Sequence, residues 1–166
     1  MPAPATPGRL LVTLVILTLT PGAFIADYNH THLFNPRWPP HARFHNAQTM
    51  SMSIALTLPT LWYAWRGPRS STRQSTGAPA AAAAAAAQAD DLADSIVTAT
   101  IFATIYPLTT LTAWFFPTVL AVDPEFGTGF PQFKIMTTGI AVAWAGCALE
   151  LARVRGVKAK ASGKGA

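Results

Sequence analysis

Long stretches without a charged residue dominate the pattern of this chain. Four such blocks cover residues 10–26, 47–65, 95–122 and 135–149. Their lengths compare with the roughly 20 apolar residues that an α-helix needs to cross the hydrocarbon core of a bilayer. The pattern therefore predicts an all-α membrane protein, a single bundle of four transmembrane helices.

The predicted helices cover residues 10–26, 47–65, 95–122 and 135–152. The fourth reaches residue 152 only if Glu150 lies at the membrane interface, where it can pair with Arg153 three residues further along. Pro107 lies in the middle of the long third block and predicts a kink there.

Two connecting regions are less regular. Residues 67–94 read as a low-complexity cytoplasmic loop that contains an alanine run at 80–87. Pro79 could begin a helix that continues through this run into the third span, because proline suits the first turn of a helix. Residues 153–166 form a basic tail.

The distribution of lysine and arginine predicts the topology. Nine of the twelve basic residues flank the blocks on one side, and three lie on the other. The three are Arg37, Arg43 and Lys134. Because the basic side faces the cytoplasm, both termini are expected there. The expected location is the endoplasmic reticulum membrane, in the absence of a retention or mitochondrial signal. A cleaved signal peptide at residues 9–26 is the alternative reading of the first block.

Composition agrees with a membrane protein and excludes several other classes. Only 11% of the 166 residues are charged, against about 25% in soluble domains. The net charge of +5 comes from helix ends and the tail, without the aromatic-interleaved basic patch of a nucleic-acid binder. Cys147 is the single cysteine, so no internal disulfide is expected. No phosphate-binding loop, nucleophile elbow or dinucleotide fingerprint is present.

All four histidines fall within sixteen positions, at His30, His32, His41 and His45. Pro39 and Pro40 suit the first turn of a helix that runs into the second span. His41, His45, Gln48 and Met52 then share one face of that helix. A polar stripe is thus expected to descend from the outer interface into the bundle, where polar groups face a cavity instead of lipid.

Three uses of this region compete. In the first, His41 or His45 is a general acid or base, supported by Asp27 and His32. The substrate-binding candidates are polar and aromatic residues of the two outer loops and the stripe: Asn35, Arg37, Trp38, Arg43, Gln48 and Glu125. In the second, three histidines and Asp27 hold a metal ion, or a haem binds. In the third, these residues only tie the loop across the bundle mouth. No cofactor is predicted.

From Asp27 to His45 the chain reads D-x-N-x-T-H-x-F-N-P-x-W-P-P-H-A-R-F-H. This run resembles small four-helix membrane proteins of fungi and bacteria that are classed as a family of unknown function. Fungal members often carry an acetyltransferase label, although this sequence offers no coenzyme A site, and some lie near natural-product pathway genes. The resemblance implies the four-helix topology. It implies no reaction.

The sequence hypothesis is a multi-pass membrane protein that acts on a small lipophilic molecule. An isomerase, cyclase or hydrolase of secondary-metabolite biosynthesis is the leading form, and a non-catalytic accessory protein or carrier is the alternative. The expected partners are the lipid bilayer and the small substrate. A homodimer could form through the small residues Gly139, Ala143 and Gly146, although packing within the bundle is the first explanation for them.

Overall fold

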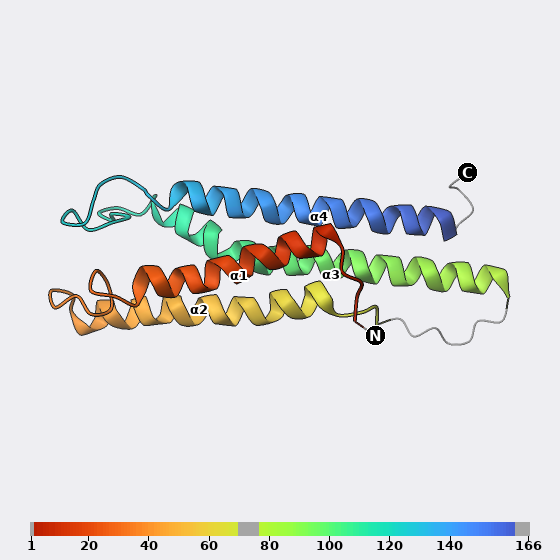
Figure 1. The fold of residues 1–166 in the computed structure, drawn as a ribbon, viewed down its shortest axis with the longest axis horizontal. Coiled ribbons are helices and arrows are strands. Elements are labelled where there is room, and N and C mark those ends of the chain that lie inside the picture. Colours follow the sequence, from red (N-terminus) through yellow and green to blue (C-terminus); the bar gives the residue numbers. More distant parts are fainter. Residues whose placement is uncertain (1, 70–76, 162–166) are drawn as a thin grey trace.

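The computed structural model describes residues 2–69 and 77–161, which form four antiparallel helices side by side (Figure 1). These are α1 (Pro7–Asp27), α2 (Pro40–Trp65), α3 (Ala78–Ala113) and α4 (Phe133–Ala161). The connections 28–39 and 114–132 lie at one end of the bundle, and α1 begins and α4 ends at the other. The all-helical prediction is confirmed. Two of the basic residues counted for the topology, Arg73 and Lys164, lie outside the described residues.

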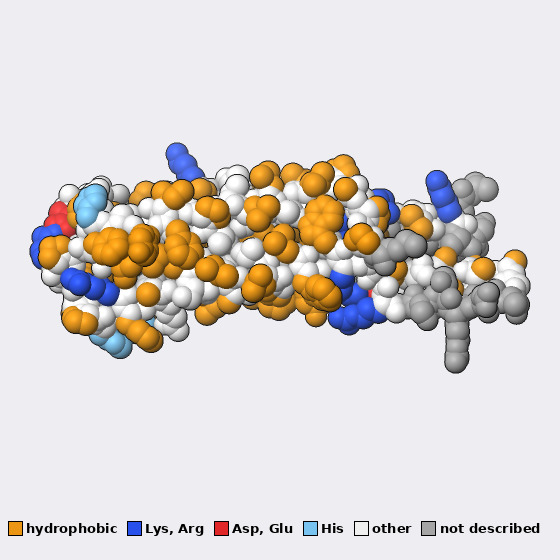
Figure 2. Space-filling model, turned by 60° about the horizontal axis from the view of Figure 1, so that its bottom comes forward, with side chains coloured by type: hydrophobic (Ala, Val, Ile, Leu, Met, Phe, Trp, Pro, Cys, Tyr) orange, Lys and Arg blue, Asp and Glu red, His pale blue; other side chains and the backbone are white. Residues whose placement is uncertain are grey.

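Three of the helices, α1, α3 and α4, are long and apolar enough to cross a membrane. The second helix has the length but is less apolar, because polar residues such as Gln48, Ser51 and Thr57 continue along it beyond its first turns. On the face drawn in Figure 2, hydrophobic side chains cover much of the bundle, most lysine and arginine side chains lie toward its two ends, and the histidines lie at one end. Such a surface is compatible with an integral membrane protein.

Helices α1 and α2 begin as their sequences indicate. The Thr6 hydroxyl accepts a hydrogen bond from the amide of Arg9 and so caps α1, as threonine commonly does. Helix α2 begins at Pro40 and continues without a break to Trp65. The expected helix from Pro40 into the second span is therefore confirmed.

Helix α3 lies earlier in the sequence than the expected 95–122. It begins at Ala78, because Pro79 suits the first turn and alanine has the highest helix propensity. Residues 78–94 of the expected loop are therefore helical, which agrees with the prediction that Pro79 begins a helix continuing through the alanine run into the third span. The helix ends at Ala113, since the backbone before Pro117 is disfavoured in helical geometry. Pro107 lies inside the helix, and Figure 1 shows α3 bending in this last part.

Helix α4 continues nine residues beyond the expected end at Ala152 and includes most of the basic tail. The charged residues Arg153, Arg155 and Lys158 end the apolar stretch, but they do not end the helix, since lysine and arginine are good helix formers. The apolar stretch of α4 therefore ends before Arg153, whereas the helix itself ends at Ala161.

Small residues let α1 and α4 approach closely. A Cβ added at Gly146 would lie 2.7 Å from the carbonyl oxygen of Gly8, and Gly139 faces Val15. Ala143, between them on α4, is fully buried. The small-residue stripe thus packs within the chain, as first expected. A homodimer through the same stripe stays a prediction, and its partner helix would have to replace α1.

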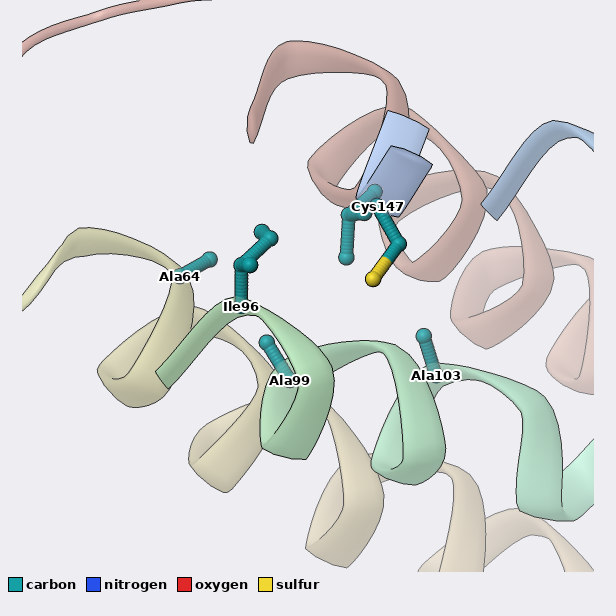
Figure 3. Packing of buried hydrophobic residues seen from close by; sticks show 6 residues of the cluster. Ala64, Ile96, Ala99, Ala103 and Cys147 are labelled. Carbon is teal, nitrogen blue, oxygen red and sulfur yellow. The ribbon is translucent and has the colours of Figure 1, made fainter. Parts of the chain in front are cut away.

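The core between the other helices is also built from small side chains. Figure 3 shows Ala64 of α2 pointing toward Ile96 of α3, and Cys147 of α4 pointing toward the α3 residues Ala99 and Ala103. All five are at most 1% exposed. Cys147 is thus a buried small side chain of the core.

A buried ionic cluster joins three helices at the end where α1 begins. Arg9 is fully buried and its Nε donates to Oε1 of Glu150 at 2.8 Å, while its Nη1 donates to the carbonyl oxygen of Ala64. Glu150 also accepts from Arg153 at 2.7 Å and from the Thr6 hydroxyl at 2.6 Å. The expected Glu150–Arg153 pair is confirmed, and Arg9 is a second partner that the sequence did not indicate.

Candidate functional site

A cavity of about 690 Å³ lies at the end of the bundle that carries the connections 28–39 and 114–132. All four helices and the connection 114–132 contribute to its wall. Most of the lining is apolar, with Leu19, Met52, Val119, Phe130 and Met136 as examples. Its volume lies within the roughly 300–1,000 Å³ of typical small-molecule sites.

Four of the site residues predicted from the sequence line this cavity. They are Asp27, His32, His45 and Gln48. Asp27 is the last residue of α1, and His45 and Gln48 are on α2. The structure therefore brings polar groups from two helices and one loop to a mainly apolar space.

The stripe on α2 is formed as its spacing predicts. Nε2 of His45 lies 3.1 Å from Nε2 of His41, and Nδ1 of His45 lies 3.2 Å from Oε1 of Gln48. Because an amide oxygen only accepts, Nδ1 of His45 is the donor in this arrangement. In neutral His45 the Nε2 atom is then the acceptor, and His41 donates to it. His41 is exposed and does not line the cavity.

A second polar group lies where α1 enters the loop. Nε2 of His32 is 3.8 Å from Oδ1 of Asp27, and Nδ1 of His32 is 2.6 Å from the Thr31 hydroxyl. The His32 ring also makes an edge contact with the ring of Trp38. Asn46, buried on α2, lies beside the Asp27 carboxylate. Contacts on both nitrogens and on the ring fix the orientation of His32.

The other predicted substrate-binding residues are outside the cavity wall and hold the two connections together. Trp38 donates to Oδ2 of Asp123 at 3.1 Å, and Arg37 forms an ion pair with Glu125. Arg43, in the first turns of α2, donates to the backbone carbonyl of the buried Asn35 in the first loop at 2.8 Å. These contacts match the expected tying of the loop across the bundle mouth.

Six polar residues that line the cavity were not singled out from the sequence, namely four threonines, Tyr106 and Gln132. Tyr106 lies on α3 one residue before Pro107, and Gln132 lies just before α4. The Gln132 amide donates to the backbone carbonyl of Ala121 at 2.8 Å. Neither belongs to the histidine-rich stretch, so only the packing of the helices places them beside it.

The described part of the chain offers no ready metal site. Within residues 2–69 and 77–161, no three histidine, cysteine, aspartate or glutamate side chains are grouped so that they could hold a metal ion. The ring of His30 makes an edge contact with the ring of Phe126. The metal-binding alternative therefore gains no geometric support.

Comparison with known proteins places the chain in a family without giving it an activity. Neither the curated proteins nor the solved structures contain a match. One family model, described as a family of unknown function (DUF6640), matches residues 11–161, and this range includes nearly all of the four-helix bundle. The chain belongs to this family of unknown function, DUF6640.

Proposed function

We propose that this protein is a multi-pass membrane protein that binds a small lipophilic molecule in the cavity and transfers a proton to or from it. One observation carries the proposal: a mainly apolar space of about 690 Å³ holds Asp27, His32 and His45 in its wall. Apolar walls suit a lipophilic body, and a few acid–base groups suit the transfer of a proton.

In the proposed topology all four helices cross the bilayer and both termini are cytoplasmic. Support for α2 as the fourth span comes from its packing along both α1 and α3. Its polar first turns face the cavity at His45 and Gln48, so they need not contact lipid. The excess of lysine and arginine at the end where α4 finishes supports the orientation. The proposed membrane is the endoplasmic reticulum.

His45 is the proposed acid–base residue. An imidazole gains or loses its proton near neutral pH, so it can act in either direction. Both histidines are exposed, but only His45 lines the cavity, and the Nε2 atoms of the two rings lie 3.1 Å apart. His41 can therefore exchange a proton with water and with His45 without contacting the ligand. The sequence assigned the acid–base role to His41 or His45. In the proposed arrangement, His45 acts on the ligand and His41 exchanges the proton with water.

Asp27 and His32 form the second proposed acid–base group, in another part of the cavity wall. Removal of a proton by one group and delivery by the other would move a double bond or close a ring. Isomerisation or cyclisation is therefore the proposed reaction class, with hydrolysis as a further form. Secondary-metabolite biosynthesis is the proposed setting, and it is supported by the resemblance of the Asp27–His45 run to proteins encoded near such pathways.

The test is lipophilic metabolite profiling of the host strain after deletion of the gene. Wild type, His45→Ala, His41→Ala and His30→Ala are returned at protein levels matched by immunoblot. General acid–base catalysis contributes about 10²–10⁴-fold to a rate, so His45→Ala is expected to leave the deletion profile unchanged. His41→Ala should restore it partly. His30, which packs on Phe126, serves as the matched control and should restore it fully.

Other outcomes separate the alternatives. Restoration of the profile by His45→Ala at equal abundance would refute acid–base catalysis. If the histidine variants change only abundance or partner binding, the protein is an accessory component or carrier. If deletion changes no lipophilic compound, the proposed substrate class is wrong.

A further inference from the structure

The segment Trp114–Leu120, between α3 and α4, carries large apolar side chains on the molecular surface. Phe115 is 83% exposed and Phe116 is 66% exposed. Trp114, Val119 and Leu120 are each at least 44% exposed. Water-soluble proteins rarely expose so much contiguous apolar surface unless something covers it.

Backbone geometry restricts where this segment can lie relative to a bilayer. It follows α3, which is one of the helices apolar enough to cross a membrane. Its own backbone is not helical, because Pro117 excludes a helix and Thr118 has a positive φ of 65°. Non-helical backbone does not face lipid in the hydrocarbon core, where its polar groups would lack partners. The membrane–water interface satisfies both requirements, and tryptophan is enriched there.

The same segment also forms part of the cavity wall. Trp114, Val119 and Leu120 line the cavity directly. The Trp114 ring stacks on Phe130 at 5.0 Å between centroids, and Phe130 lines the cavity too. One short stretch of chain therefore has the cavity on one side and an exposed apolar surface on the other.

We infer that Trp114–Leu120 inserts into the outer membrane interface and separates the cavity from the lipid. A lipophilic ligand then enters past this segment from the bilayer and does not cross water. The occupant of the exposed apolar surface is lipid, at the boundary between headgroups and acyl chains. The entry route rests on the proposed ligand and reaction, whereas the insertion of the segment rests only on the proposed membrane topology.

Insertion is tested by fluorescence on the full chain in phosphatidylcholine vesicles. A Cys147→Ala background leaves one introduced cysteine, placed at Phe116→Cys or, as the matched control in the same connection, at Thr128→Cys. Each is labelled with the environment-sensitive dye NBD. At position 116 we expect blue-shifted emission, with loss of intensity on adding doxyl-labelled lipid and little loss with aqueous iodide. At position 128 the two quenchers should act in the opposite order. Strong iodide quenching at 116 without doxyl quenching would overturn the inference.

The entry route is tested separately in the deletion strain. Phe115→Glu/Phe116→Glu places two charges in the proposed lipid contact and should fail to restore the profile at normal abundance, while Thr128→Glu restores it. Restoration by the double variant would refute the route but not the insertion. If deletion changes no metabolite, the proposed function fails, and the fluorescence result still decides whether the segment is inserted. The two experiments therefore test the insertion of the segment and the proposed reaction independently.

Discussion

Glu150→Ala is expected to destabilise the bundle by about 3–5 kcal/mol, the usual cost of removing one partner from a buried ion pair. Arg9 would keep its charge while fully buried, with its Nε donor no longer paired. Arg153 and the Thr6 hydroxyl would lose the same acceptor. Unfolding of the purified protein in mixed micelles, followed by circular dichroism against denaturant, measures the change.

Two control variants compare the stability contributed by this buried cluster with that of an exposed ion pair. Lys158→Ala breaks the Lys158–Asp90 pair, in which both side chains are about half exposed, so a change of at most about 1 kcal/mol is expected. Arg9→Met/Glu150→Met removes both charges and should be more stable than either single change, because no unpaired buried charge remains. If Glu150→Ala costs no more than Lys158→Ala, the buried pair does not stabilise the bundle.

The second large effect is expected at the contact between α1 and α4. In Gly146→Ala, the added Cβ would lie 2.7 Å from the carbonyl oxygen of Gly8 and 2.9 Å from Cβ of Leu11. Both obstacles are backbone or backbone-proximal atoms, so the helices must separate. Overpacking of a core costs about 1–3 kcal/mol, and we expect the upper part of this range. The same micelle unfolding measurement reports it.

Gly156 on α4 is the matched control for that substitution. Nothing lies within 4 Å of a Cβ placed there. Gly156→Ala should therefore raise helix stability, by up to about 1 kcal/mol from the difference in helix propensity. Equal effects of Gly146→Ala and Gly156→Ala would contradict the close approach of α1 and α4.

The sequence predicted the number and order of the helices better than their ends. A charge-free block indicates which residues can contact lipid, and it does not indicate where a helix ends. The fourth helix was therefore expected to end before Arg153, although α4 continues to Ala161. The opposite error occurred after Ala113, where the apolar residues 114–122 read as helix. Trp114, Val119 and Leu120 line the cavity, and Phe115 and Phe116 are exposed on the surface. Their apolar character therefore does not indicate a helix, which Pro117 prevents.

The candidate site was predicted as far as local spacing allowed. His45 and Gln48 are three residues apart on one helix, so their common face follows from the helical repeat. Tyr106 and Gln132 could not be found in this way, since packing of the bundle alone brings α3 and the start of α4 to the cavity that α2 also lines. Arg9 was read as a flanking cation that orients the first helix. Its burial depends on Glu150, which lies 141 positions away in the sequence.

The length of α3 gives the molecule a practical advantage for imaging. Its 36 residues extend about 54 Å at 1.5 Å per residue, whereas the hydrocarbon core is about 30 Å thick. Figure 1 shows its first part reaching beyond α1 and α2, and the Lys158–Asp90 pair joins it there to α4. A rigid fiducial protein fused helix-to-helix at this end would share one continuous axis with the bundle. Such a fusion would give this small four-helix bundle the mass and shape that particle alignment in electron cryomicroscopy requires.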